Sequence, residues 1–124
     1  MRSAASLRAA CAATFAVLPL AAQVTYDRIR AAEKEPQNWL TYSGDYTGRR
    51  HSLLKQIDAA NAARLRPSWI FQMDLAHKLE TSPLVVDGVM YLSEPPSNVT
   101  ALDVRTGQPL WRYRRHIPQG VRYC

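Results

Sequence analysis

The sequence has 124 residues, a formal net charge of +6 and 47% hydrophobic residues. This length allows one small domain or a part of a larger one, and it excludes several full-size domains. The sequence contains no glycine-rich phosphate loop, no nucleophile elbow and no zinc-like spacing of histidines with cysteines or acids, which excludes the enzyme classes built on those motifs.

Residues 1–22 have the pattern of a secretory signal peptide. Arg2 and Arg8 precede the apolar run AACAATFAVLPL, and the small residues Ala21 and Ala22 follow it. The run is shorter than the roughly 20 residues that a membrane-spanning helix needs. We therefore expect export to the periplasm, with an uncleaved signal that anchors the protein as the alternative. Loss of two arginines would lower the net charge from +6 to +4.

The two cysteines of the sequence, Cys11 and Cys124, indicate where a disulfide partner should be sought. Export places a protein in an oxidising compartment where disulfides form. Removal of the signal peptide would take Cys11 with it and leave Cys124, the last residue, as the only cysteine. A lone cysteine is unusual in an exported protein, so we expect its partner to lie beyond this chain's end.

For residues 23–66 we expect an irregular segment that precedes the predicted strands. Trp39, Tyr42 and Tyr46 lie there among turn-forming residues. Within it, LLKQIDAANAARLR at 53–66 allows a short helical turn, whereas Asp58 and Asn61 favour a loop.

The pattern of residues 67–124 predicts a series of short strands. SWIFQM at 68–73 is typical of a strand with Trp69 and Phe71 on one face and Ile70 on the other. Asp87-Gly88 between apolar runs is a strong hairpin signal, because a type I′ turn needs positive φ at both central positions. This predicts strands at about 84–86 and 89–93.

A second pair of strands follows the break at Glu94-Pro95-Pro96-Ser97, where proline cannot continue a ladder. We expect strands at about 98–102 and 109–114, joined by a turn within ALDVRTGQPLW. Gly107 can take the positive φ of this turn, and Asp103 and Thr106 can hydrogen-bond its backbone.

Four short antiparallel strands make one small all-β sheet that cannot bury its own faces. A Trp-x-aromatic pattern occurs at Trp69 and again at Trp111, 42 positions later. Four strands per period of roughly 40–50 residues is the signature of a β-propeller. The Trp on the returning strand suggests a repeated module that docks against another copy of itself.

The sequence resembles the pyrroloquinoline-quinone (PQQ) dependent alcohol dehydrogenases. Ala101, Asp103, Thr106, Gly107 and Trp111 match their tryptophan-docking motif. The stretches NWLTYSGDYTGRRHSLLKQI, NAARLRPSWIFQ and ETSPLVVDGVMYLS also look like the amino-terminal part of these enzymes. The resemblance implies an incomplete part of an eight-bladed β-propeller, with the first blade region at 67–124. It also implies that this chain alone has no dehydrogenase activity and is poorly stable.

The resemblance carries two cofactor-binding residues onto this sequence. Glu80 matches a glutamate that hydrogen-bonds the quinone at the start of an inner strand; the alternative is a solvated turn carboxylate. Cys124 matches the first of two adjacent cysteines that close a disulfide ring above the cofactor, a ring that cannot form here without the second cysteine.

The remaining chemistry is implied to lie downstream. Relatives of this kind hold calcium or a lanthanide ion with later residues and use a later Asp as base, so we assign no catalytic residue and no metal ligand here. The resemblance implies PQQ as cofactor, a small alcohol as substrate and a cytochrome c as electron acceptor, and it leaves a homo-oligomer of the full-length protein open.

Two other classes of function compete with this interpretation. A non-enzymatic propeller of the same repeat type could act as a scaffold in the cell envelope, but it would have no use for Glu80 or Cys124. The basic run at 112–116 suggests nucleic-acid binding as a second alternative. Export and the ordinary alternation of side chains along a strand argue against this function. His51, His77 and His116 are expected to be surface residues.

Overall fold

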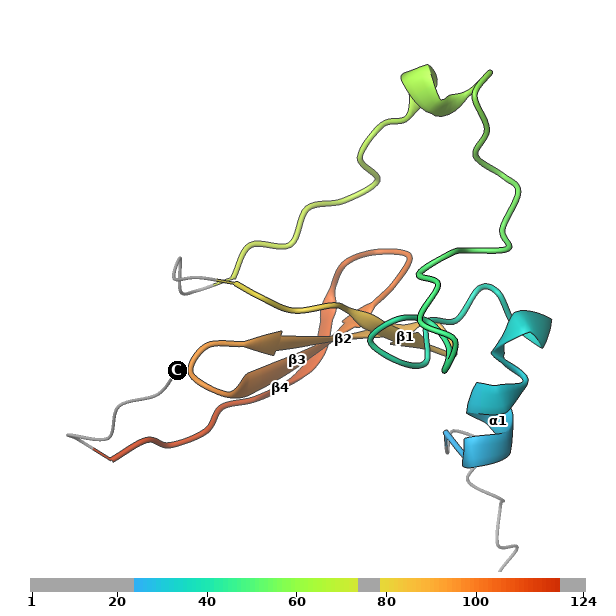
Figure 1. The fold of residues 1–124 in the computed structure, drawn as a ribbon. Helices are drawn as coiled ribbons and strands as arrows, with labels where there is room; N and C mark the ends of the chain where they lie inside the picture. Colours follow the sequence, from blue (N-terminus) through green and yellow to red (C-terminus); the bar gives the residue numbers. More distant parts are fainter. Residues whose placement is uncertain (1–23, 74–78, 119–124) are drawn as a thin grey trace, which may run out of the picture.

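The computed structural model describes residues 24–73 and 79–118 (Figure 1). The predicted signal peptide at 1–22, His77 and Cys124 lie outside these ranges. The described chain begins with two short helices, then a long irregular stretch, and ends with four strands. Their bounds are α1 Tyr26–Arg30, η1 Ala32–Lys34, η2 Ala62–Arg64 (the η elements are 3₁₀ turns), β1 Leu84–Val86, β2 Val89–Glu94, β3 Asn98–Asp103 and β4 Pro109–Tyr113.

The four strands form one antiparallel sheet in the order β1-β2-β3-β4. The predicted all-β sheet is confirmed, and the four strands predicted between residues 84 and 114 agree with the structure to within one residue at each end. Asp87 and Gly88 connect β1 to β2 with φ values of 50° and 82°. Both central residues therefore have the positive φ that a type I′ hairpin turn requires.

The turn between β3 and β4 is held by the side chains that the sequence singles out. Asp103 Oδ1 accepts the backbone N–H groups of Arg105 and Thr106, both at 2.9 Å. Thr106 Oγ1 accepts the N–H of Gln108 at 3.3 Å, and Gly107 has a φ of 70°. The pairing then shifts between Ala101 and Leu102, which produces a bulge in the ladder.

The strand predicted at 68–73 is wrong, because this stretch has no regular secondary structure. A strand needs a neighbour for its backbone hydrogen bonds, and no strand of the described residues pairs with it. The predicted alternation of side chains still holds. Trp69 contacts the β3–β4 turn, the guanidinium of Arg112 lies 5.4 Å from the centre of the Phe71 ring, and Ile70 is 87% exposed.

The segment predicted to be irregular holds helix α1 near its start. Thr25 caps this helix by accepting the N–H of Arg28 on Oγ1 at 3.2 Å, and Asp27 lies in its first turn. At 53–66 both alternatives occur, since a loop built on Asp58 precedes the single 3₁₀ turn η2. None of the helices in the described ranges is long and apolar enough to cross a bilayer.

The core is small and lies along β2 and β3. Leu92, Ala101 and Leu102 are buried there. Leu40 is also buried and comes from the segment that precedes the sheet, residues 24–66, which we call the leading segment. Trp39 pairs with Val85 by two backbone hydrogen bonds of 2.8 and 3.0 Å, so the leading segment covers the outer edge of β1. In Figure 1 the stretch between residues 50 and 70 instead runs away from the sheet before it returns.

Candidate cofactor site

An open hollow of about 410 Å³ lies where the chain enters β1. This volume is within the range of small-molecule sites, which combine apolar walls with a few polar groups. Its walls come from the leading segment, the approach to β1, and strands β1 to β3. The lining residues are Tyr42, Glu80, Thr81, Ser82, Leu84, Tyr91, Leu92, Ser93 and Val99.

Glu80 lies on the stretch before β1, four positions ahead of its first residue, and is exposed. The neighbouring Thr81 is tied to β2 by a hydrogen bond of 2.8 Å between its Oγ1 and Oγ of Ser93. The approach to β1 is therefore fixed beside the hollow, and Glu80 lies in its lining. Its contact with a cofactor stays a prediction, as does the role of Cys124.

Two tyrosines supply the aromatic part of the lining. Tyr91 on β2 lies 6.0 Å from Trp111 on β4, measured between ring centres, which supports its ring from one side. Tyr42 comes from the leading segment and carries the guanidinium of Arg50 4.6 Å from its ring centre. No local sequence pattern predicts that Tyr42 joins Glu80, because their proximity depends on how the segment before the sheet folds back.

A cluster of polar side chains, which we call the clasp, holds this leading segment on the sheet. Arg28 of α1 donates to Glu35 at 2.7 Å and to Asp87 of the β1–β2 turn at 2.9 Å. Asn38 donates to Glu35 and accepts the N–H of Asp87 at 2.9 Å. The clasp therefore fixes the residue next to Trp39, whose pairing with Val85 leads the chain toward Tyr42.

The clasp shifts the ionisation of its charged members. Hydrogen bonds from the Arg28 guanidinium hold the pKa values of the Glu35 and Asp87 carboxyls below their ordinary ranges. The same bonds, first from Glu35 and then from Asp87, raise the pKa of Arg28. All three groups are charged at neutral pH.

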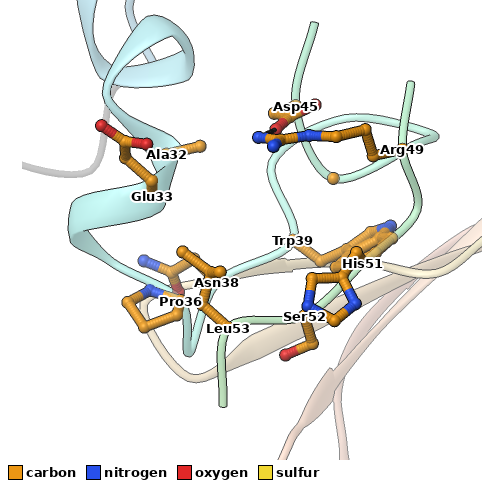
Figure 2. A pocket seen from close by; sticks show the side chains of 11 residues that line it. Ala32, Glu33, Pro36, Asn38, Trp39, Asp45, Arg49, His51, Ser52 and Leu53 are labelled. Carbon is orange, nitrogen blue, oxygen red and sulfur yellow. Dashed lines mark ion pairs between the residues drawn. The ribbon is translucent and has the colours of Figure 1, made fainter. Parts of the chain in front are cut away.

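A second, much smaller pocket of about 50 Å³ lies between η1 and the loop after Trp39 (Figure 2). Arg49 pairs with Asp45 at 3.6 Å on one side of it, and Trp39, His51 and Ser52 lie on another. Its volume suits one or two water molecules. Glu80 does not line it, so we place the candidate cofactor site at the larger hollow.

The hollow can hold a flat polar ligand. Aromatic rings can lie against such a ligand, and the hydroxyls of Tyr91, Thr81 and Ser93 can hydrogen-bond its oxygens. The described residues contain no cluster of three or more histidines, cysteines or acids that could hold a metal ion.

Comparison with known proteins matches residues 39–123 to a family described as PQQ, the glucose/ethanol/alcohol dehydrogenase β-propeller domain. The quinohemoprotein alcohol dehydrogenase ADH-IIG of Pseudomonas putida is 45% identical over 92 residues, which cover 74% of this chain and 13% of that protein. Its solved structure superposes with a TM-score of 0.72 at 46% identity, covering 74% of this chain and 14% of that one.

Two further relatives extend the comparison. A 1-butanol dehydrogenase (cytochrome c) of Thauera butanivorans is 43% identical over 81 residues, covering 65% of this chain and 12% of that protein. A europium-containing methanol dehydrogenase superposes with a TM-score of 0.66 at 35% identity, covering 73% of this chain and 16% of that one. This chain spans 12–20% of the length of the curated relatives it matches. The sheet is thus one blade-like part of a propeller, and the chain belongs to the PQQ-type alcohol dehydrogenase β-propeller family.

Proposed function

We propose that this chain is the amino-terminal part of a quinoprotein dehydrogenase that oxidises small alcohols to aldehydes with PQQ and a bound metal ion. The observation that carries the proposal is that Glu80 lines a hollow of about 410 Å³ within a chain of this family. The relatives are named as alcohol dehydrogenases, and one name includes cytochrome c. A cytochrome c is accordingly the proposed electron acceptor.

The chain's own residues would bind and orient the cofactor. Glu80 would accept hydrogen bonds from the polar edge of the quinone, and the hydroxyls of Thr81 and Ser93 would lie beside it. Tyr91, supported by Trp111, would offer a flat apolar surface that excludes water from the ring. A quinone held by these residues would supply a hydride acceptor for the alcohol carbon, and a metal ion beside it would supply Lewis-acid polarisation.

The metal ion, calcium or a lanthanide, would be held by residues outside the described part of the chain. Residues 1–22 support periplasmic location through their signal-peptide pattern. Cys124 would contribute to the site through a disulfide with a following cysteine. The 124-residue chain alone would be inactive, because the resemblance implies that the metal ligands and the catalytic base come from later residues.

The test begins with the nucleotide sequence that follows the codon of Cys124, where we expect a second cysteine and further Trp-containing repeats. The complete product of that reading frame, loaded with PQQ and calcium or a lanthanide, should reduce a dye in the presence of ethanol or 1-butanol. Glu80→Gln should weaken PQQ binding about tenfold, since it removes one charged hydrogen-bond acceptor.

The 124-residue chain serves as the comparison and should show no activity. A complete product that folds, binds neither PQQ nor metal and oxidises no alcohol would contradict the proposal. That result would favour the scaffold instead.

A further inference from the structure

The stretch that leads into β1 is tied to β2 by a contact between two hydroxyl groups. The backbone ladder of the two strands starts at Leu84, and the residue before it, Pro83, has no N–H with which to extend the ladder. Within the described ranges, the hydrogen bond of 2.8 Å between Oγ1 of Thr81 and Oγ of Ser93 is the one that joins residues 81–83 to β2. This side-chain bond therefore takes over where the ladder stops.

The two members of the Thr81–Ser93 pair are held in different ways. Ser93 belongs to β2 and pairs with Val99 of β3, so the sheet fixes its backbone. Thr81 lies outside the strands, and its hydroxyl connects it to this fixed point. Because threonine is branched at Cβ and has few rotamers, a bond to its hydroxyl also restricts the backbone of residue 81. The rigidity of the sheet thus reaches the residue next to Glu80.

The Thr81–Ser93 pair lies in the lining of the hollow together with Glu80. Ser93 is exposed, so water competes for its hydroxyl and the bond adds little to the stability of the chain on its own. A ligand that covers this lining excludes that water, and a hydrogen bond is stronger where water is excluded. The bond between the two hydroxyls should therefore become stronger when the hollow is occupied.

We propose that the Thr81–Ser93 pair positions Glu80 for ligand binding by holding the stretch before β1 against β2. The inference rests on the proposed function, since it takes PQQ as the ligand of the hollow. Thr81 and Ser93 are positioning residues in this proposal, because they act through Glu80. The alternative is that each hydroxyl binds the quinone by itself, and it gives a different result in double variants.

The first test measures PQQ binding to the complete product of the reading frame by quenching of tryptophan fluorescence. Thr81→Val removes the hydroxyl but keeps the shape of the side chain, and it should weaken binding about three- to tenfold. Thr81→Ser keeps the hydroxyl and should bind within about twofold of the unmodified protein. Thr47→Val is the matched control, because it breaks a hydroxyl bond of 2.6 Å to Asp45 that lies outside the lining of the hollow. It should bind PQQ as the unmodified protein does.

Double variants decide whether the two hydroxyls act together and through Glu80. Ser93→Ala should weaken PQQ binding as much as Thr81→Val, and the two changes combined should cost no more than either one, because both remove the same bond. In a Glu80→Gln background, Thr81→Val should weaken binding by less than about twofold. Losses that add in either cycle would show that the hydroxyls act independently and would overturn the inference.

Melting temperatures separate a role in ligand binding from a role in folding. Without PQQ, Thr81→Val should melt within about 2 °C of the unmodified complete product, because the exposed bond adds little stability. With PQQ at a fixed concentration, Thr81→Val should gain less in melting temperature than the unmodified protein does, since its affinity is lower. An equal fall in melting temperature with and without PQQ would mean that the pair has a structural role alone.

The outcomes also distinguish this inference from the proposed function. If Glu80→Gln weakens PQQ binding while Thr81→Val binds within about twofold of the unmodified protein, the positioning role is overturned and the site stands. If Thr81→Val weakens binding and Glu80→Gln does not, the pair does not act through Glu80, and the inference is again overturned. If neither variant changes PQQ binding, both the site and the inference are overturned.

Discussion

Trp69 and Trp111 begin the same Trp-x-aromatic pattern but have different surroundings. The indole of Trp69 donates from Nε1 to the carbonyl of Val104 at 3.0 Å and packs against Gly107 in the β3–β4 turn. Trp111, on β4 of the same blade, is 48% exposed and contacts Tyr91. Trp69 is therefore held by the turn between β3 and β4, which lies 35 or more positions later in the chain, whereas no such turn of the described residues contacts Trp111.

The surroundings of Gly107 and Trp111 show what each of these two residues of the stretch ALDVRTGQPLW contacts. Gly107 makes room for the preceding tryptophan, because a Cβ at this position would lie 2.5 Å from Cδ2 of Trp69. Trp111 pairs across the ladder with Ala101, a fully buried small residue. The β3–β4 turn thus receives the indole of Trp69, while the face of β4 that carries Trp111 stays exposed in the described residues.

The largest loss of stability should come from a substitution that adds atoms to the space that Trp69 occupies. Gly107→Ala adds a Cβ against the indole at a φ of 70°, so overpacking and backbone strain combine. We expect the free energy of unfolding of the complete product to fall by about 2–4 kcal/mol, measured by urea denaturation. Gly48→Ala is the control, because its φ is 69° but nothing lies within 4 Å of the added Cβ. It should cost about 1 kcal/mol, and equal losses in both variants would show that the indole does not press on Gly107.

A smaller effect should come from the tryptophans themselves. Trp69→Phe removes the hydrogen bond to Val104 and should cost about 1 kcal/mol in the same assay. Trp111→Phe should cost a similar amount in the complete product, because the resemblance implies that a following Thr-Gly turn covers its exposed face. A change within about 0.5 kcal/mol for Trp111→Phe alone would mean that Trp111 stays half-exposed and that no such turn follows.

The same contrast separates what the sequence predicts from what it does not. Both hairpins follow from local signals, since Asp87-Gly88 and Asp103 with Gly107 specify their turns within a few residues. SWIFQM has the pattern of a strand but no partner strand in the described residues, so its pattern alone could not decide its structure. The regular structure of a strand depends on the whole sheet, whereas a turn depends on its own side chains.

The candidate site divides in the same way. The resemblance to a family led to the proposal of Glu80, and the approach to β1 places it in the lining of the hollow, while its contact with a cofactor stays a prediction. Tyr42 could not be found, because it joins the lining through the fold of the segment before the sheet, which the clasp and the pairing of Trp39 with Val85 hold on the sheet. Contacts between segments 38 or more positions apart leave no pattern in one sequence.

The smallest effect on stability should come from the clasp. The clasp joins the leading segment to the sheet through the contacts of Arg28 and Asn38 with Asp87. Glu35 and Asp87 have lowered pKa values in the folded chain, first because of their hydrogen bonds with Arg28. A depressed carboxyl pKa contributes stability that is fully present above the ordinary values of 4.5 and 3.8, and that is lost as the pH falls through the folded values. The melting temperature should therefore decline below about pH 4.5 in the unmodified protein, and Arg28→Gln should flatten this decline while lowering the melting temperature slightly at pH 7.

Arg30→Gln provides the matched control for the clasp, because Arg30 lies on the same helix and is 64% exposed, with its nearest carboxylate oxygen, on Asp27, 3.9 Å away. It should leave both the melting temperature at pH 7 and its acid dependence unchanged. If Arg28→Gln and Arg30→Gln have the same pH profile as the unmodified protein, the clasp does not hold the leading segment on the sheet. The pairing of Trp39 with Val85 would then hold Tyr42 beside the hollow without the clasp. The leading segment would in that case be held by the edge strand β1 rather than by the β1–β2 turn.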